Sequence, residues 1–422
     1  MKPLLEIVGR HKAGQPVGVY SLCSAHPLVI ETAMREAQAT STPLLIEATC
    51  NQVNQFGGYT GMTPAAFREF VHGIAERQSF PHPRLWLGGD HLGPNAWRQK
   101  PAAVAIKDAE ELVAQCVAAG FRKLHLDCSM TCADDPQSLP EETIAARAAH
   151  LGAVAERAWR THGGEAPVYV IGTEVPVPGG ANEELETIAV TKPEAVATTI
   201  ALHRRAFLEA DLAPAWSRVI ALVVQPGVEF DHDKVVDYQP GAARALSAFV
   251  ENDPQFVFEA HSTDYQTPEN LRALVRDHFA ILKVGPAATF AMRQTLWALA
   301  TIAAELPGEP IADLRDVVIG AMRADPGHWR GHYRDEESQS LNLAHSLSDR
   351  IRYYWPRPDV QRAYHALLAR LRRESMPLTL LSQYLPRQYE SIRAGQLDAN
   401  VDAVLSDGIA SSLRPYIRAC YA

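Results

Sequence analysis

Short apolar runs alternate with longer amphipathic stretches from the N-terminus to Leu306. Each run is rich in β-branched residues and precedes a stretch of about ten to twenty residues with helical periodicity. The eight runs are Val17–His26, Pro43–Asn51, Leu85–Pro94, Lys123–Met130, Val168–Val175, Arg218–Gly227, Gln255–Tyr265 and Ala280–Pro286. Because no convincing hairpin dipeptide joins them, the pattern predicts parallel strands connected by helical crossovers.

Eight such units can close into a (β/α)8 TIM barrel, and we predict this α/β fold for residues 1–306. The alternative is an open doubly wound sheet, but no G-x-G-x-x-G motif follows the first run. Beyond Pro307, strand patterns stop and helical patterns rich in Leu, Tyr and Trp continue. We therefore expect residues 307–422 to form a C-terminal helical extension packed on the barrel.

Several helices have clear start signals. Thr63-Pro64 and Thr267-Pro268 each place a capping hydroxyl before a proline at the first helical position. Thr191 and Glu194 have the spacing of a capping box. These signals support the predicted crossovers.

Composition narrows the functional classes. No segment approaches the roughly 18 uninterrupted apolar residues of a membrane span, and the N-terminus lacks a secretory apolar segment. We therefore expect a cytoplasmic protein with six reduced cysteines. A net charge of −9 without a run of Lys and Arg argues against nucleic-acid binding, so a small ligand is favoured.

Polar residues cluster where the predicted strands end, which is where the active site of such a barrel forms. Every strand contributes at least one ionisable or amide group, and burying such groups without partners is costly. They are His26, Glu47, Asn51, Gln52, Asp90, His91, Asp127, Glu174, Gln225, Glu229, His261, Asp264 and Lys283. Together they predict one concave polar pocket.

Asp90 and His91 are the sharpest local signal, within Gly88-Gly-Asp-His-Leu-Gly-Pro94. Glycine lets backbone approach a ligand, an imidazole can bind a divalent metal, and the carboxylate can move a proton. With His261 and Glu174, His91 forms a predicted metal site that suits zinc or manganese. The alternative is a purely structural role, in which Asp90 caps a turn and His91 and His261 pack in the core.

The other strand-end groups divide by expected role. His125 shares strand parity with Asp127 but lies deeper, so we expect a core or supporting role. Lys283 could form a Schiff base, although pairing with a phosphate or carboxylate is favoured. The candidate catalytic carboxylates are Asp90, Glu47, Asp127 and Glu229. The candidate substrate and phosphate ligands are Asn51, Gln52, Ser262, Asp264, Lys283, Gly285, Arg350 and Arg352, the last two reaching over from the extension.

Long motifs along the whole chain resemble the GatZ/KbaZ family, with KbaZ the closer of the two. They are Cys23–Val29, Leu45–Pro64, Gly88–Asn95, Val170–Gly180, Val224–His232, Glu259–Gln266 and Ser348–Pro356. The resemblance implies a Z-type subunit of class II D-tagatose-1,6-bisphosphate aldolase that supports a separate catalytic Y-type subunit. It also implies a role in catabolism of galactitol or N-acetylgalactosamine.

Two hypotheses follow from this resemblance. The chain is either a partner protein for the catalytic subunit or, by itself, a metal-dependent ketohexose-6-phosphate 4-epimerase; a homo-oligomer stays open. Family members have also been described as tagatose-6-phosphate kinases, but no glycine-rich nucleotide loop with an adjoining lysine is present. Glu174 stands near the place where the catalytic aldolases have a zinc-binding histidine, which argues against autonomous aldolase activity.

Overall fold

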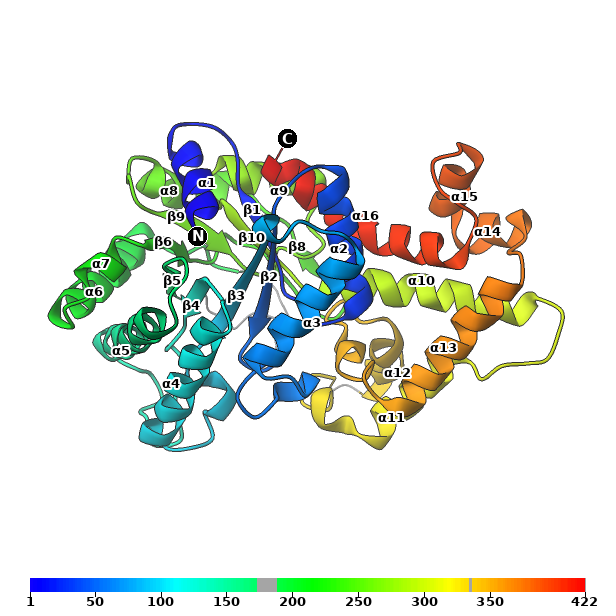
Figure 1. Cartoon of the computed structure of the whole chain (residues 1–422), viewed down its shortest axis with the longest axis horizontal. Helices are drawn as coiled ribbons and strands as arrows, with labels where there is room; N and C mark the ends of the chain where they lie inside the picture. Colours follow the sequence, from blue (N-terminus) through cyan, green and yellow to red (C-terminus); the bar gives the residue numbers. More distant parts are fainter. Residues whose placement is uncertain (173–187, 334–335, 422) are drawn as a thin grey trace.

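The computed structural model describes residues 1–172, 188–333 and 336–421. Within these ranges, eight parallel strands close into a barrel in the order β1-β10-β9-β6-β5-β4-β3-β2 (Figure 1). The strands are β1 (Val19–Leu22), β2 (Leu44–Thr49), β3 (Leu85–Leu92), β4 (Lys123–Leu126), β5 (Val168–Gly172), β6 (Val219–Val223), β9 (Val257–Ala260) and β10 (Ile281–Val284). The predicted TIM barrel is confirmed, and the doubly wound alternative is excluded.

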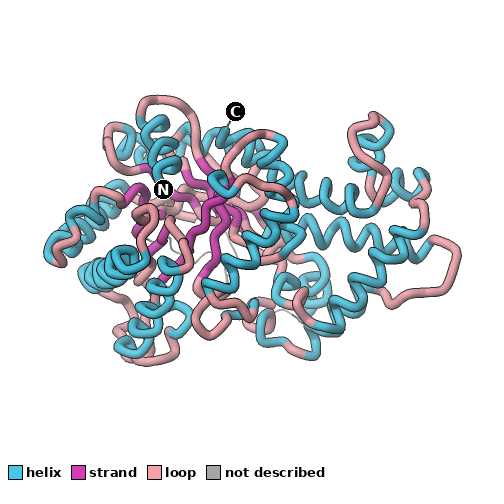
Figure 2. The backbone as a smooth tube through the Cα atoms, in the orientation of Figure 1, coloured by secondary structure: helices cyan, strands magenta, loops and turns pink. Residues whose placement is uncertain are grey.

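Helices surround the barrel strands, as Figure 2 shows. Those that follow a barrel strand are α2 (Pro27–Ala39), α3 (Pro64–Arg77), α4 (Ala102–Ala118), α5 (Glu141–His162), α6 (Pro193–Glu209), α8 (Pro240–Glu251), α9 (Pro268–Arg276) and α10 (Pro286–Glu305). Two others are α1 (Lys2–Lys12) and α7 (Ala213–Trp216). Within the described ranges, no helix combines the length and apolar character that a membrane span needs.

The helix starts are largely as predicted. Thr63 and Thr267 cap α3 and α9 by accepting the backbone N–H three residues ahead. The predicted capping box at Thr191 is wrong, because Pro193 takes the first helical position and makes Lys192 the N-cap. The Thr191 hydroxyl instead accepts the backbone N–H of Gln225 at 2.8 Å.

A small antiparallel hairpin follows β6 and was not predicted. Its strands, β7 (Glu229–Phe230) and β8 (Val235–Val236), lie outside the barrel sheet. Each strand is only two residues long, and the sequence between the two strands contains no dipeptide typical of a tight hairpin turn. The hairpin carries Glu229 beyond the end of β6.

The C-terminal residues form further helices and return to the barrel. They are α11 (Leu314–Ala324), α12 (Glu336–His345), α13 (Pro358–Arg373), α14 (Leu378–Tyr384), α15 (Pro386–Arg393) and α16 (Val401–Tyr421). The last helix, α16, packs against α2, α9 and α10 and so joins the outer helical layer (Figure 1). A Cβ atom at Gly408 of α16 would lie 2.1 Å from the Thr295 hydroxyl, which shows how closely α16 and α10 approach. A domain boundary at residue 306 stays a prediction.

Strand register brings charged side chains to one level inside the barrel. Glu47 pairs with Gly88, which in turn pairs with Lys123 on the next strand. A Cβ atom at Gly88 would lie 2.6 Å from Glu47 Oε1, so the missing side chain makes room for this carboxylate. Gly93 is as tightly constrained, since a Cβ there would lie 1.7 Å from the Asp127 carbonyl oxygen. We expected these glycines to admit a ligand, but they accommodate groups of the barrel itself.

Candidate active site and metal centre

A cavity of about 490 Å³ opens at the C-terminal ends of the strands. Its walls come from the strand ends and from the segment of the extension that contains Arg350 and Arg352. The predicted site residues that line it are Asn51, Gln52, Asp90, His91, His261, Ser262, Asp264, Lys283, Gly285, Arg350 and Arg352. Glu47 and Asp127 are buried beside these residues, whereas Glu174 lies outside the described residues. The structure thus gathers most of the predicted set around one space.

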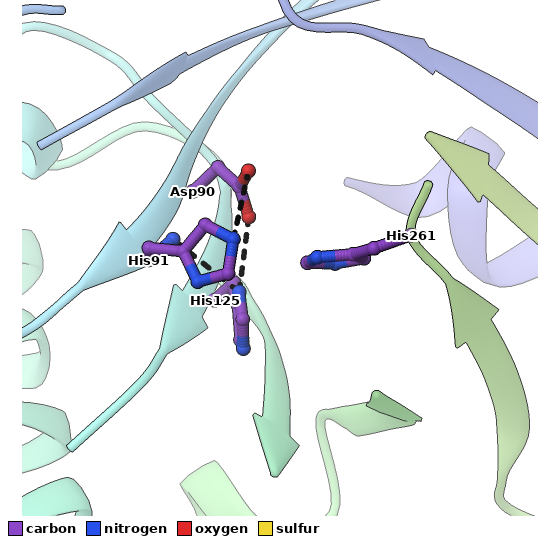
Figure 3. A group of neighbouring side chains, drawn as sticks. All are labelled: Asp90, His91, His125 and His261. Carbon is purple, nitrogen blue, oxygen red and sulfur yellow. Dashed lines mark hydrogen bonds and ion pairs between the residues drawn. The ribbon is translucent and has the colours of Figure 1, made fainter. Parts of the chain in front are cut away.

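Three imidazoles and one carboxylate lie close together beside this cavity (Figure 3), and three of these side chains, Asp90, His91 and His261, line it. Asp90 and His91 come from β3, His125 from β4, and His261 follows β9. The ring centroids are 4.9 Å apart for His91 and His125, 5.0 Å for His91 and His261, and 5.4 Å for His125 and His261. One potential ligand atom from each of the four side chains lies within 4.8 Å of the others.

One ring nitrogen of each histidine lies within hydrogen-bond distance of an acceptor outside the cluster. Asp127 Oδ2 lies 2.8 Å from Nδ1 of His91, the Gly172 carbonyl 2.9 Å from Nε2 of His125, and Glu259 Oε1 2.9 Å from Nε2 of His261. This arrangement is typical of metal-binding histidines, because the outer hydrogen bond fixes the tautomer and the ring orientation.

Charged side chains fill the barrel beneath the cluster. The Lys123 ammonium lies 2.6 Å from Glu47 and 2.7 Å from Glu259. Lys283 pairs with the other Glu47 oxygen and lies 3.0 Å from Asp90. All five residues are at most 5% exposed.

The charges of this buried region do not balance. Among the described residues of the interior, the ammonium groups of Lys123 and Lys283 lie against three carboxylates, those of Glu47, Asp90 and Glu259. A fourth buried carboxylate, that of Asp127, lies against His91. With neutral imidazoles, two negative charges remain in excess. Uncompensated buried charge is costly, so the region suits a bound divalent cation or protonated histidines. The nitrogen-rich donor set suits zinc.

Neighbouring charges tune the groups that line the floor. Burial opposes ionisation of Asp90, but the charges of His91 and Lys283 outweigh it and hold the Asp90 pKa well below its usual range. Burial likewise disfavours the charged form of Lys283, but Asp90 and other nearby acidic groups raise its pKa well above the usual value. Burial lowers the pKa of His261 to about 4. A protonated, ion-paired Lys283 is a poor nucleophile, which argues against a Schiff base.

Cationic side chains line the cavity on the side of the extension. The guanidinium groups of Arg350 and Arg352 both donate to the Tyr353 hydroxyl oxygen, at 3.3 and 2.9 Å. Burial alone would raise the Tyr353 pKa, but the charges of Arg352 and Arg350 outweigh it and lower the pKa. Two guanidinium groups that converge on one oxygen form a geometry that suits an anion such as phosphate.

A buried ion pair positions this arginine segment. Arg293 of α10 donates to Asp349 Oδ1 at 2.8 Å, and Thr289 donates to the other Asp349 oxygen at 2.6 Å. Arg293 also donates to the carbonyl of Ala344, which holds the end of α12. The arginines at the cavity are therefore fixed to a barrel helix through Asp349.

Backbone strain also gathers at the cavity. His91, Ser262 and Asp349 have positive φ angles of 48°, 51° and 44°. Such conformations cost non-glycine residues of the order of 1 kcal/mol each and cluster at functional sites. Two of the three residues line the cavity, and the third carries the arginine segment.

Glu229 is buried in the β7–β8 hairpin, where it does not line the cavity. Burial raises its pKa from 4.5 to about 7. Between these pH values the folded chain binds a proton that the unfolded chain has released, so this residue makes the free energy of unfolding fall as pH rises. We expect Glu229→Gln to reduce this slope, measured by urea denaturation at pH 5 and pH 8. An unchanged slope in Glu229→Gln would contradict the raised pKa of Glu229. Glu269→Gln, which replaces an exposed carboxylate, is the control.

Sequence reasoning missed several residues at this site. Lys123 and Glu259 were not singled out, although each alternates with a candidate: Lys123 with His125 and Asp127, and Glu259 with His261. Alternate residues of a strand share a face, so this spacing was the available signal. Further residues that line the cavity are Cys23, Thr49, Tyr59, Asn95, Arg98, His332 and Tyr353. Those from the extension carried no strand pattern that could place them.

Comparison with known proteins gives matches across nearly the whole chain. Residues 4–421 match the family described as D-tagatose-1,6-bisphosphate aldolase subunit GatZ/KbaZ-like. A crystal structure of a probable tagatose 6 phosphate kinase from Sinorhizobium meliloti 1021 is 48% identical, with a TM-score of 0.88, and the match covers 96% of this chain and 100% of that one. A fructose-bisphosphate aldolase from Campylobacter jejuni is 14% identical, with a TM-score of 0.46, over 87% of this chain and 91% of that one.

Proposed function

Because the chain belongs to the GatZ/KbaZ-like family of D-tagatose-1,6-bisphosphate aldolase subunits, we propose that it is the Z-type subunit, which supports the activity and stability of a separate catalytic Y-type subunit. The observation that carries this proposal is the family match over residues 4–421. A protein that binds the folded partner stabilises it by mass action and needs only a complementary surface. The proposed pathway is catabolism of galactitol or N-acetylgalactosamine through D-tagatose 6-phosphate.

A second candidate function is a ketohexose-6-phosphate 4-epimerase activity of the chain by itself. The cavity favours it, because a scaffold has no need for the costly buried acids and histidines of its floor. We propose that His91 and His261 hold a divalent metal, zinc or manganese, and Glu174 stays a predicted further ligand. When bound, such an ion would polarise the carbonyl of a ketose.

Asp90 is the proposed proton carrier of this reaction. Its carboxylate lies at the cavity floor, within reach of a substrate hydroxyl in the cavity. It would take the proton of the C4 hydroxyl as the C3–C4 bond breaks. After the aldehyde has turned, it would return the proton to the new C4 oxygen as the bond re-forms. Glu47, Asp127 and Glu229 stay predicted catalytic residues that lie behind or beside the cavity.

The proposed phosphate site is formed by Arg350 and Arg352 with the last strand–helix loops. The Lys283 charge is already paired with Glu47 and Asp90, so the arginines provide the positive charge for a ligand. Gly285 and Ser262 line the same cavity. The other proposed substrate contacts are Asn51, Gln52 and Asp264, which also line it.

Replacing Arg352 tests the phosphate site. Arg352→Gln is expected to weaken binding of tagatose 6-phosphate about 10- to 100-fold, the size of one lost charge-assisted hydrogen bond. Binding of unphosphorylated tagatose should not change. Arg357→Gln is the matched control, because Arg357 follows the same segment but pairs with Asp325 and Asp359 away from the cavity. Titration calorimetry gives the affinities, and equal losses in both variants would contradict the site.

The two functions are tested by purifying the chain alone. We expect it to contain a divalent metal and to interconvert tagatose 6-phosphate and fructose 6-phosphate without cleaving tagatose 1,6-bisphosphate. A metal-free, inactive chain that still stabilises the Y-type subunit would leave only the partner function. A cytoplasmic location is part of the proposal, since the six cysteines are free thiols.

A further inference from the structure

The start of α10 lies at the cavity, in the part of the barrel where phosphate is frequently bound. In (β/α)8 barrels the loops after the last two strands and a helix N-terminus offer backbone N–H groups to a phosphate. Here the N–H groups of Gly285 and Ala287 both donate to Asp264 Oδ1, at 3.0 and 2.8 Å, and Pro286 between them has no N–H. The next N–H, that of Ala288, donates to the Gly285 carbonyl. A carboxylate of the chain itself therefore occupies the donors that a phosphate would use.

Asp264 is a fixed part of this arrangement. Its side chain lines the cavity but is only 3% exposed. The preceding residue, Thr263, donates its hydroxyl to the Lys283 carbonyl, and its own carbonyl accepts the Tyr416 hydroxyl at 2.7 Å. The loop is thus held against both β10 and α16. Burial raises the Asp264 pKa to about 6, so the group is a carboxylate at pH 8.

A carboxylate at this position selects between two kinds of ligand group. It repels a phosphate, because two negative charges in contact at a partly buried site are unfavourable. It attracts a hydroxyl, because an ionised carboxylate only accepts hydrogen bonds. The end of a sugar that reaches Asp264 should therefore carry a hydroxyl and no phosphate.

The extension supplies the other place where an anion can bind. Arg350 and Arg352 converge on the Tyr353 hydroxyl, and all three residues line the cavity. The Tyr353 ring is stacked on His328, with ring centroids 4.7 Å apart and an interplanar angle of 11°, and Tyr59 meets it edge-on at 4.7 Å. Contacts with two other rings thus fix the place at which the guanidinium groups meet.

We propose that the cavity has a single phosphate site, on Arg350 and Arg352, and that Asp264 closes the second place at the start of α10. The ligand is then a sugar monophosphate whose unphosphorylated end donates a hydroxyl to Asp264. This inference rests on the proposed phosphate site and narrows it, because the amides at the start of α10 no longer serve the phosphate. A bisphosphate would bring its second phosphate against Asp264.

Titration calorimetry of the wild-type chain at pH 8 tests the number of sites and the selection without any variant. We expect inorganic phosphate to bind with a stoichiometry of one. Tagatose 6-phosphate should bind about 10-fold more tightly than tagatose 1,6-bisphosphate, or better, because only the bisphosphate places a charge against Asp264. Two bound phosphates, or a bisphosphate that binds as tightly as the monophosphate, would overturn the inference.

Replacing Asp264 tests its role directly. Asp264→Asn removes the charge but keeps an oxygen that can accept from Gly285 and Ala287, so we expect it to remain folded by circular dichroism. The affinity for the bisphosphate relative to the monophosphate should rise about 10-fold or more. Asp264→Ala also frees the two amides and should raise this ratio further. The matched control is Asp277→Asn, which replaces a carboxylate that accepts from Tyr238 and does not line the cavity.

The outcomes distinguish this inference from the phosphate site on which it rests. An unchanged affinity ratio in folded Asp264→Asn and Asp264→Ala chains would overturn the role of Asp264 and leave the arginine site standing. A folded wild-type chain that binds neither inorganic phosphate nor tagatose 6-phosphate would overturn the phosphate site and this inference together.

Discussion

Replacing Asp90 by asparagine is expected to slow the interconversion of tagatose 6-phosphate and fructose 6-phosphate by the isolated chain about 10²- to 10⁴-fold. Asparagine preserves the shape of the side chain and can still bond to Lys283, but it cannot take the proton of the C4 hydroxyl. The effect should fall on kcat, with little change in KM, because the arginines of the cavity remain. Stopped assays that quantify both sugars measure it.

The same variant separates the two proposed functions. Asp90→Asn, His91→Ala and His261→Ala should all leave the chain's support of the thermal stability of a Y-type subunit largely intact, because partner binding needs a different surface. Asp277→Asn is the matched control, since Asp277 accepts a hydrogen bond from Tyr238 and does not line the cavity. Loss of partner support in a folded Asp90→Asn chain would mean that the cavity is part of the interface.

Removal of one buried ammonium should have the largest effect on stability. Lys123 is completely buried between Glu47 and Glu259, at 2.6 and 2.7 Å. Lys123→Met would leave both carboxylates with one cation fewer, and breaking a buried ion pair from one side costs about 3–5 kcal/mol. Urea denaturation gives the change in the free energy of unfolding.

Two further variants define the cause of this loss. Adding Glu259→Gln to Lys123→Met should recover part of the stability, because the second change removes one of the uncompensated charges. Lys100→Met removes a partly exposed lysine that pairs with Asp108 at 2.7 Å, and it should change the free energy of unfolding by less than about 1 kcal/mol. Equal effects of Lys100→Met and Lys123→Met would contradict the role of the buried network.

The barrel could be predicted because each strand is a continuous apolar run with clear breaks. A parallel strand is buried on both faces, so its sequence carries a strong local signal. The strand-end rule then placed Asp90, His91 and His261 at one face, and the structure brings them to one cavity. Pairing Glu47 with Lys123 and Lys283 could not be predicted, because register across strands far apart in sequence is not visible in one strand's pattern.

The C-terminal extension shows a different limit of prediction from the sequence. Its helices were expected, but the packing of α16 against α10 depends on the close approach of Gly408 to Thr295. His125 was placed in a supporting role because it precedes the strand end. In the barrel, His91 at the end of β3 lies at the same depth as His125 of β4, and their ring centroids are 4.9 Å apart. Depth along a strand therefore needs the register of the whole barrel.

The most direct test of the central claim is to add the purified chain to a Y-type tagatose-bisphosphate aldolase subunit. The measured quantities are the rate of tagatose 1,6-bisphosphate cleavage and the half-life of that activity at elevated temperature. We predict that the chain forms a complex with the Y-type subunit, raises the cleavage rate and lengthens the half-life. A folded chain that leaves both quantities unchanged at concentrations well above that of the Y-type subunit would contradict the account.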